Sequence, residues 1–327
     1  MHKMKKLIQS REASLLLVLV LLCLVIQMRN SSFLTANVIN SILKNYSYTM
    51  TLSVGMLMVL LIGGIDISVG ATLAFSGMTA SLLMRSGILT NGFAVFAAST
   101  LIGTLCGLIT GLVISKGKVI PIIATLGIRY IYRGMSYLIS DFKSVNASSM
   151  LPDYKDFAQS STLGINHLVW ITLCVYAVFF VVLRWTRLGR RIYAVGSNPS
   201  AAVVSGIPAD RIKIFVYTVM GSICGLCGSM YVSYYASAQN NMAMGIEMDV
   251  IASCVVGGVA LSGGRGSIAG VLIGSVTIAV ISKSLSLVGI NPFWQQALKG
   301  AIILFAIVVN VIVQRNMDRR VLERREV

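Results

Sequence analysis

The most constraining feature of this sequence is a single carboxylate, Asp66, inside the apolar run of residues 57–74. An aspartate at the centre of a bilayer-length apolar segment costs roughly 2.5–3.5 kcal/mol on insertion scales. Gly63, Gly64 and Gly70 flank it, and each glycine weakens a helix by about 1 kcal/mol relative to alanine. Broken backbone at membrane depth is tolerated only where protein or a water-filled cavity satisfies the freed polar groups. We therefore predict a broken helix here and a specific role for the carboxylate.

Apolar segments of near-bilayer length recur along the whole chain. Hydrophobic residues make up 56% of the sequence and charged residues only 12%, whereas soluble domains carry about 25% charged residues. A helical span needs about 20 apolar residues. The expected segments are 13–28, 44–62, 67–84, 92–114, 119–139, 167–183, 212–236, 249–262, 267–289 and 293–313. The predicted fold class is an all-α integral membrane protein with about ten transmembrane segments, and with broken or re-entrant helices near Gly63–Gly70 and Gly257–Gly264.

The distribution of basic residues predicts the orientation. Cytoplasmic loops of membrane proteins collect Lys and Arg, and most of the 27 such residues fall on inside segments if the N-terminus is cytoplasmic. The first apolar run lacks a cleavage pattern, so we interpret it as an uncleaved span. The predicted regions are a cytoplasmic N-terminus (1–12), one polytopic membrane domain (13–313) with an outer loop (140–166) and a cytoplasmic loop (184–211), and a cytoplasmic tail (314–327). The net charge of +16 then reflects topology, and no nucleic-acid partner is expected.

A short helix is expected within the predicted cytoplasmic loop. Asn198 suits the N-cap position and Pro199 the first helical position. Residues 201–204 continue as a helix, and residues 206–208, Gly-Ile-Pro, end it. Such a helix is either a surface filler or a docking element.

The glycine motif has a later echo in the chain. Gly63-Gly64 is followed by Ser68 and Gly70, and Gly257-Gly258 is followed by Ser262 and Gly264 at the same spacing. Transporters are often built from structural repeats whose broken elements line the central path. Glycine is also common in membrane helices simply as a packing residue. The echo is therefore either a second path element or ordinary packing.

Residues that carry enzyme chemistry are absent from the sequence. No Gly-x4-Gly-Lys-[Ser/Thr] phosphate loop is present, since Gly111 to Gly117-Lys118 has the wrong spacing. His2 and His167 are isolated, and the Cys224-x-x-Cys227 pair sits in an apolar segment without polar partners, where small packing residues are expected. We predict no metal site and no catalytic activity in this chain. Energy must then come from ions or from partner proteins.

Five motifs in order give the chain its resemblance to a known family. They are Gly63–Gly70, with Ile67 where Leu is usual; Thr125-Leu126-Gly127 with Tyr132-Arg133-Gly134; Gly196–Ala202 with Ser205-Gly206-Ile207; Glu247–Ala252 with Gly257-Gly258 and Leu261–Gly264; and Pro292–Gln296 with Lys299-Gly300. Together they resemble the membrane permeases of ribose-type sugar ABC importers, the group for ribose, galactose, xylose, arabinose, rhamnose and autoinducer. Asn310 stands where Asp is often expected, which leaves that position's role in doubt. The resemblance covers about residues 33–313.

The resemblance implies a permease in the bacterial inner membrane that moves a monosaccharide or related polyol-like solute into the cytoplasm by alternating access. It implies three partners: a cytoplasmic ATPase that binds ATP and Mg, a periplasmic or lipid-anchored sugar-binding protein, and a second permease copy, identical or paralogous. No cofactor would be bound by this chain itself. The helix at 198–207 would then couple to the ATPase. The residues implied in coupling are Asn198, Pro199, Ala201, Ala202, Ser205 and Gly206.

The translocation path and gate are expected at the two glycine-rich breaks. The candidate residues are Gly63, Gly64, Asp66, Ser68, Gly70, Thr72, Gly257, Gly258 and Ser262. Asp66 either contacts passing sugar hydroxyls or caps the span that follows it. Glu247 and Asp249 are expected at the outer end of the eighth segment, where they either meet the binding protein or sit at the membrane interface. The rival classes are an ion-coupled secondary transporter that uses Asp66 and a passive channel.

Overall fold

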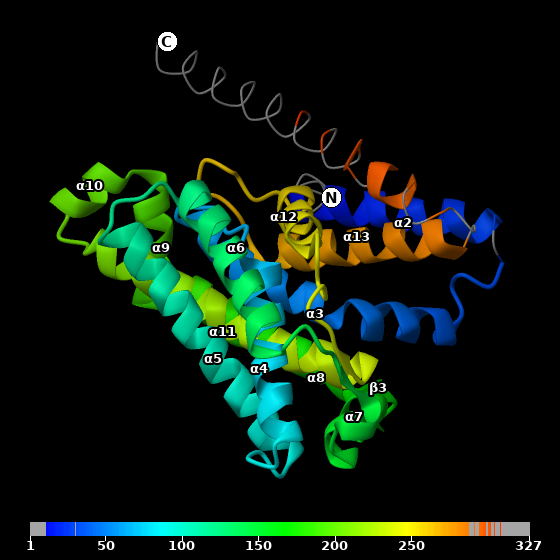
Figure 1. Cartoon of the computed structure of the whole chain (residues 1–327). Coiled ribbons are helices and arrows are strands. Elements are labelled where there is room, and N and C mark those ends of the chain that lie inside the picture. Colours follow the sequence, from blue (N-terminus) through cyan, green and yellow to red (C-terminus); the bar gives the residue numbers. More distant parts are fainter. Residues whose placement is uncertain are drawn as a thin grey trace.

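The computed structural model describes residues 11–29, 31–287, 291, 294–298, 300–301, 304 and 308. The helices are α2 (Arg11–Arg29), α3 (Ala36–Leu61), α4 (Val69–Arg85), α5 (Gly92–Ser115), α6 (Pro121–Ile139), α7 (Pro152–Gln159), α8 (His167–Trp185), α9 (Arg187–Ser197), α10 (Pro199–Val204), α11 (Ala209–Tyr235), α12 (Ile246–Val256) and α13 (Ile268–Leu287), with a 3-10 turn at Ala147–Ser149. The strands are β1 (Val145–Asn146), β2 (Ser161–Thr162), β3 (Ile165–Asn166) and β4 (Ser237–Ala238). Figure 1 shows that helices dominate the fold, as the sequence predicts.

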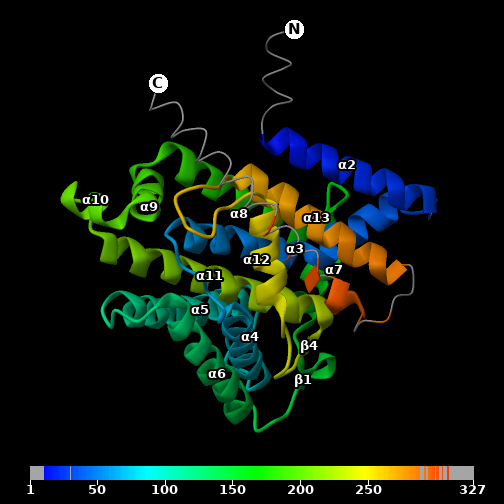
Figure 2. The ribbon, with the colours of Figure 1, turned by 90° about the horizontal axis from the view of Figure 1, so that it is seen from above.

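Helix α11 is the central element, packed on α5, α4 and α3. Its contact with α5 is set by two Gly-x3-Gly pairs, Gly103 and Gly107 on α5 and Gly221 and Gly225 on α11. A Cβ added to Gly221 would overlap the Gly103 carbonyl oxygen, so only glycine permits this approach. Small residues at this spacing let membrane helices pack backbone to backbone. The two helices lie side by side in both Figure 1 and Figure 2.

A second group of helices covers the other side of α3. Helix α13 packs on α2, α3 and α12, and α8 packs on α3 (Figure 2). The buried stretch of α3 from Thr49 to Leu61 lies in the core between these groups. Its apolar residues are enclosed by protein on every face, which explains why this half of α3 shows no amphipathic pattern.

The predicted outer loop, residues 140–166, carries short elements of its own. Strand β1 pairs antiparallel with β4, so that Val145 faces Ala238. Asp153 on α7 accepts a hydrogen bond from Gly92 N at the start of α5, with 2.6 Å between the two atoms. The connections that were predicted to lie on one side of the membrane therefore contact one another. At the opposite end, Lys118 pairs with Asp210 at 2.8 Å.

The observed helices follow the predicted segments, and α3 differs from its segment at the N-terminal end. Within the described residues, four helices are long and apolar enough to cross a membrane: Gly92–Ser115, His167–Trp185, Ala209–Tyr235 and Ile268–Leu287. Helix α3 begins at Ala36 and so starts before the predicted segment 44–62, because polar residues of its first turns continue the helix. The tenth predicted segment, 293–313, lies mostly outside the described residues. The division into regions by membrane side remains a prediction.

Both predicted helix breaks are present. Residues 62–68 form a non-helical connection between α3 and α4, and residues 257–267 separate α12 from α13. Helix α12 has only 11 residues, about 16 Å at 1.5 Å per residue. It is therefore a half-span, as the short eighth segment predicted.

Candidate functional site

The two glycine-rich breaks meet in space, and the end of α9 lies against both. We call this contact of Leu61, Gly63, Gly196, Gly263 and Gly264 the inner junction. Gly264 N donates a hydrogen bond to the Leu61 carbonyl oxygen at 2.9 Å. A Cβ on Gly196 would overlap the same oxygen, and one on Gly263 would lie 2.9 Å from Gly63 N. The echo seen in the sequence thus corresponds to two elements that pack directly against each other.

Positive backbone angles explain why glycine occurs at this junction. The φ angles are +75° at Gly63, +89° at Gly263 and +71° at Gly264, a region that side chains disfavour. Gly258 shares this conformation, and Gly257 packs on the backbone of Gly270 in α13. The predicted gate glycines are therefore required both for the turns and for the close approach.

Asp66 lies buried at the start of α4. Its Oδ1 accepts hydrogen bonds from Ser68 N at 2.8 Å and from Ser68 Oγ at 2.6 Å. Ser68 is the N-cap residue of α4, so the carboxylate bonds to the helix start, where free N–H groups and the positive dipole end favour an anion. This geometry supports the capping interpretation of Asp66 over direct contact with a solute.

The other path candidates near this break are enclosed by protein. Ser68 and Thr72 are buried, and Gly70 lies so close to Glu247 that an added Cβ would be 3.0 Å from its Oε2. Thr125 of α6 accepts a hydrogen bond from Ile67 N at 3.2 Å. Neither Ser68 nor Thr72 lines the large cavity described below. Their role in the path remains a prediction.

The predicted short helix is present as α10, at one end of the molecule in Figures 1 and 2. The Asn198 side chain accepts a hydrogen bond from Ala201 N at 2.9 Å, and Gly206 with φ +78° follows the helix. Ala202 is buried, whereas Val204 is 90% exposed. Helix α9, which ends beside it, reaches the inner junction through Gly196. Helices α9 and α10 therefore connect an exposed apolar surface to the inner junction.

An ion pair between a half-buried arginine and a buried glutamate holds the beginning of α12. Arg129 Nη2 lies 2.9 Å from Glu247 Oε1, and only 3% of the Glu247 side chain is exposed. Arg129 is near the middle of α6. Glu247 lies in the first turn of α12, at the N-terminal end of the eighth segment, and the side of the membrane that this end faces stays a prediction. Contact of Glu247 with a binding protein remains a prediction, and its pairing with Arg129 does not favour it.

The folded-back segment, residues 239–245, is tied to α6 by a second arginine. Arg133 Nη1 donates hydrogen bonds to the carbonyl oxygens of Asn240 at 2.7 Å and Met242 at 2.9 Å. The Asn240 side chain in turn accepts hydrogen bonds from Ser136 and Ser140. Irregular backbone at membrane depth needs such partners. Charged residues within a predicted span were the sequence signal for these contacts, and the sequence reasoning did not use it.

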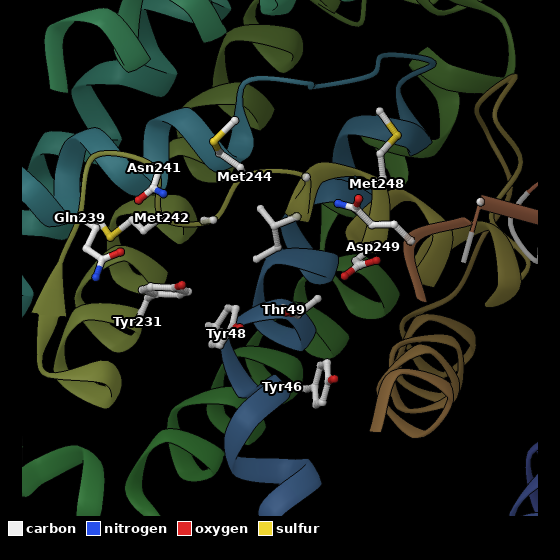
Figure 3. A pocket seen from close by; sticks show the side chains of 15 residues that line it. Tyr46, Tyr48, Thr49, Tyr231, Gln239, Asn241, Met242, Met244, Met248 and Asp249 are labelled. Atoms are coloured by element: carbon white, nitrogen blue, oxygen red, sulfur yellow. The ribbon is translucent and has the colours of Figure 1, made fainter. Parts of the chain in front are cut away.

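A cavity of about 740 Å³ lies beside the start of α12. We call it the outer cavity; Figure 3 shows the side chains around it. Its walls come from α3, α11, the segment 239–245, α12 and the short helical turn at 294–298. The lining side chains with polar groups are Tyr46, Tyr48, Thr49, Tyr231, Gln239, Asn241, Asp249 and Gln296. Of these, the sequence reasoning named Asp249 as a candidate and Gln296 as part of a family motif. The others lie on α3, α11 and the segment 239–245, and nothing in the spacing between these elements links them.

Known proteins resemble this chain along most of its length. A family model described as "Branched-chain amino acid transport system / permease component" matches residues 38–307. The ribose import permease protein RbsC of Escherichia coli strain K12 is 35% identical over 301 residues, which cover 91% of this chain and 93% of that protein. RbsC of Haemophilus influenzae is 37% identical over 296 residues, 89% and 90% of the two chains. The galactose/methyl galactoside import permease protein MglC of E. coli K12 is 33% identical over 317 residues, 92% and 94%. No solved structure matches the chain.

Proposed function

The chain belongs to the family of branched-chain amino acid transport system permease components, and on that premise we propose that it is the membrane-spanning subunit of an ABC importer for a monosaccharide. It is a multi-pass inner-membrane protein. The observation that carries the proposal is the match of nearly the whole chain to import permeases named for ribose and for galactose. The protein has a transport role, and hydrolysis of ATP belongs to a separate subunit.

The geometry supports alternating access with movement transmitted through α9. Helix α10 presents Val204 at the surface, where a cytoplasmic ATPase would dock. Because α9 follows α8 and precedes α10 without a long linker, displacement of α10 moves Gly196. Gly196 contacts Leu61 and Gly264 at once, so both helix breaks respond to the same displacement. The inner junction would therefore open and close with the ATPase cycle.

Three further assignments belong to this proposal. The termini face the cytoplasm, in keeping with the distribution of basic residues. A second permease copy, identical or paralogous, completes the path, and a periplasmic or lipid-anchored protein delivers the sugar. Asp66 acts as a helix cap. The ion-coupled alternative, which needs Asp66 as its ion site, then has no ion-binding residue. The comparisons give that alternative no support.

The test is uptake of labelled sugar by cells that express the chain with its partner genes. We expect accumulation of one of ribose, galactose or arabinose against its gradient, sustained when an uncoupler is added while ATP is held constant. Collapse of uptake under the uncoupler would instead favour ion coupling, and flux without accumulation would favour a channel.

A variant pair tests the coupling helix within the same proposal. Val204→Glu should abolish co-purification of the ATPase, because a charge would replace the exposed apolar contact. Leu163→Glu is the matched control, since Leu163 is 87% exposed but lies in the loop between β2 and β3. It should leave the ATPase bound. Equal retention of the ATPase by both variants would exclude α10 as the docking element.

A further inference from the structure

We propose that the outer cavity is a sugar-binding subsite of the permease itself, built for a monosaccharide, so that this chain selects its substrate as well as conducting it. The inference rests on the proposed function, and it assigns the recognition to Tyr48, Tyr231, Asp249 and the amide side chains of the folded-back segment (Figure 3).

The cavity has the size of a small-ligand site. Its volume of about 740 Å³ falls within the range of about 300–1,000 Å³ that is usual for such sites. It differs in this respect from the inner junction, where backbone atoms are in contact and leave no space for a solute. Among the described residues, polar and aromatic side chains from several elements converge on it. Convergent polar groups in an otherwise apolar pocket are typical of a binding site.

The tyrosines supply surfaces for the apolar faces of a sugar ring. Tyr48 of α3 and Tyr231 of α11 meet edge to face, with 5.1 Å between ring centroids. Tyr46 lies two residues before Tyr48 on α3. A sugar exposes C–H groups on its ring faces and hydroxyls around its rim. An aromatic side chain buries such a face with little loss of conformational freedom, and its hydroxyl can still find a partner. The arrangement therefore suits a ring that is apolar above and below and polar at its edge.

The remaining polar groups suit hydroxyls. Gln239 and Asn241 each offer an amide that both donates and accepts, and the Asp249 carboxylate accepts. In Figure 3, Gln239 and Asn241 lie on one side of the cavity and Asp249 lies on the other, next to Thr49 and Tyr46. A ligand between these two sides would be bonded at opposite edges.

The position of the cavity fits a transport site. Gly245, with φ +83°, turns the chain from the folded-back segment into α12, and the first turn of α12 forms one wall. Substrate sites of many transporters lie near the midplane, where discontinuous helices begin. Tyr46 to Thr49 lie midway along the 26 residues of α3. A sugar released from outside would therefore reach this point before the inner junction.

The test uses the complete importer in cells, with the sugar that the wild-type protein accumulates as the probe. Tyr48→Ala should lower the initial uptake rate at least tenfold, and Tyr48→Phe should stay within twofold, because the ring is kept. Asp249→Asn should lower uptake of the sugar at least fivefold and reduce its preference over the corresponding deoxy sugar. Tyr130→Ala, an exposed tyrosine on α6, is the matched control and should transport normally.

The outcomes separate this inference from the proposed function. If the wild-type importer accumulates no sugar, the proposed function fails. The cavity is not a subsite if the wild-type importer accumulates sugar and the Tyr48→Ala and Asp249→Asn variants, at equal membrane levels, take up sugar at the wild-type rate. Because Tyr48→Phe and Asp249→Asn preserve shape, they remain informative if Tyr48→Ala does not fold. In that case, an unchanged preference for the deoxy sugar in Asp249→Asn overturns the inference.

Discussion

The two ends of α12 lie in opposite environments. Its first turn carries Glu247 and Asp249 and borders an open cavity with aromatic and polar walls. Beyond its last turn, Gly257 packs against the backbone of Gly270, and Gly263 and Gly264 pack against Gly63 and Gly196. The first turn is held by charged side chains and borders an open cavity. The other end is held by close contact between glycine backbones, with no cavity beside it.

This difference indicates how a short helix can connect two functions. A helix of 11 residues moves as one body, so a shift at the inner junction displaces the wall of the outer cavity. The charged end fixes α12 to α6 through Arg129, and the glycine end fixes it to α9 through Gly264. Substitutions at these two contacts and at the cap of α4 should break or sharpen the comparison, with effects that decrease in that order.

The largest effect is expected at the charged end. Arg129→Ala leaves the Glu247 carboxylate, whose side chain is only 3% exposed, without its partner, which should destabilise the permease by about 3–5 kcal/mol. The double variant Glu247→Leu with Arg129→Leu should recover much of that loss, because no buried charge remains. Thermal unfolding of the purified protein measures both. Asp141→Ala, which removes an exposed ion pair with Lys143, is the control and should leave the Tm unchanged. An Arg129→Ala protein as stable as the wild type would show that the ion pair does not hold α12.

A smaller but substantial effect is expected at the glycine end. Gly196→Ala forces a methyl group onto the Leu61 carbonyl oxygen, and overpacking of this kind costs about 1–3 kcal/mol. It should also stop transport, because the contact between α9 and both helix breaks must separate. Gly127→Ala on α6 meets nothing within 4 Å and should be neutral or slightly stabilising. The uptake rates and melting temperatures of the two variants are compared. Normal uptake by Gly196→Ala would show that transport does not depend on close packing at the inner junction.

The smallest effect is expected at the cap of α4. Asp66→Asn keeps an oxygen that can accept from Ser68 N and Oγ, so substantial transport should remain. Asp66→Leu removes the acceptor and should cost about 1–2 kcal/mol, the value of a lost helix cap. Transport and membrane levels of both variants are measured. Equal loss of transport in both, with normal membrane levels, would refute the capping account and point to a role for the charge itself.

Much of the fold followed from local patterns. Apolar segments separated by basic and polar stretches predicted the helices, because the bilayer requires spans of a certain length and satisfied backbone. The breaks at residues 62–68 and 257–267 were predicted from glycine, and α10 from the order of Asn198, Pro199 and Gly206. These signals are local, since each depends on the conformational limits of the residues concerned. The pairing of Glu247 with Arg129 was not predicted, because it depends on how residues 239–245 place the start of α12 against α6.

The sequence by itself determined the class of protein, the helical segments, the two breaks and the family. It did so through hydropathy, glycine spacing and ordered motifs, which act within a few residues of one another. Only the tertiary structure decided that the two breaks touch each other and Gly196, that Arg129 pairs with Glu247, and that Tyr48, Tyr231 and Asp249 border one cavity. These contacts join residues up to about two hundred positions apart, and their distances are set by the packing of α3, α11 and α12. Packing at that range is decided by the whole chain and not by any one segment.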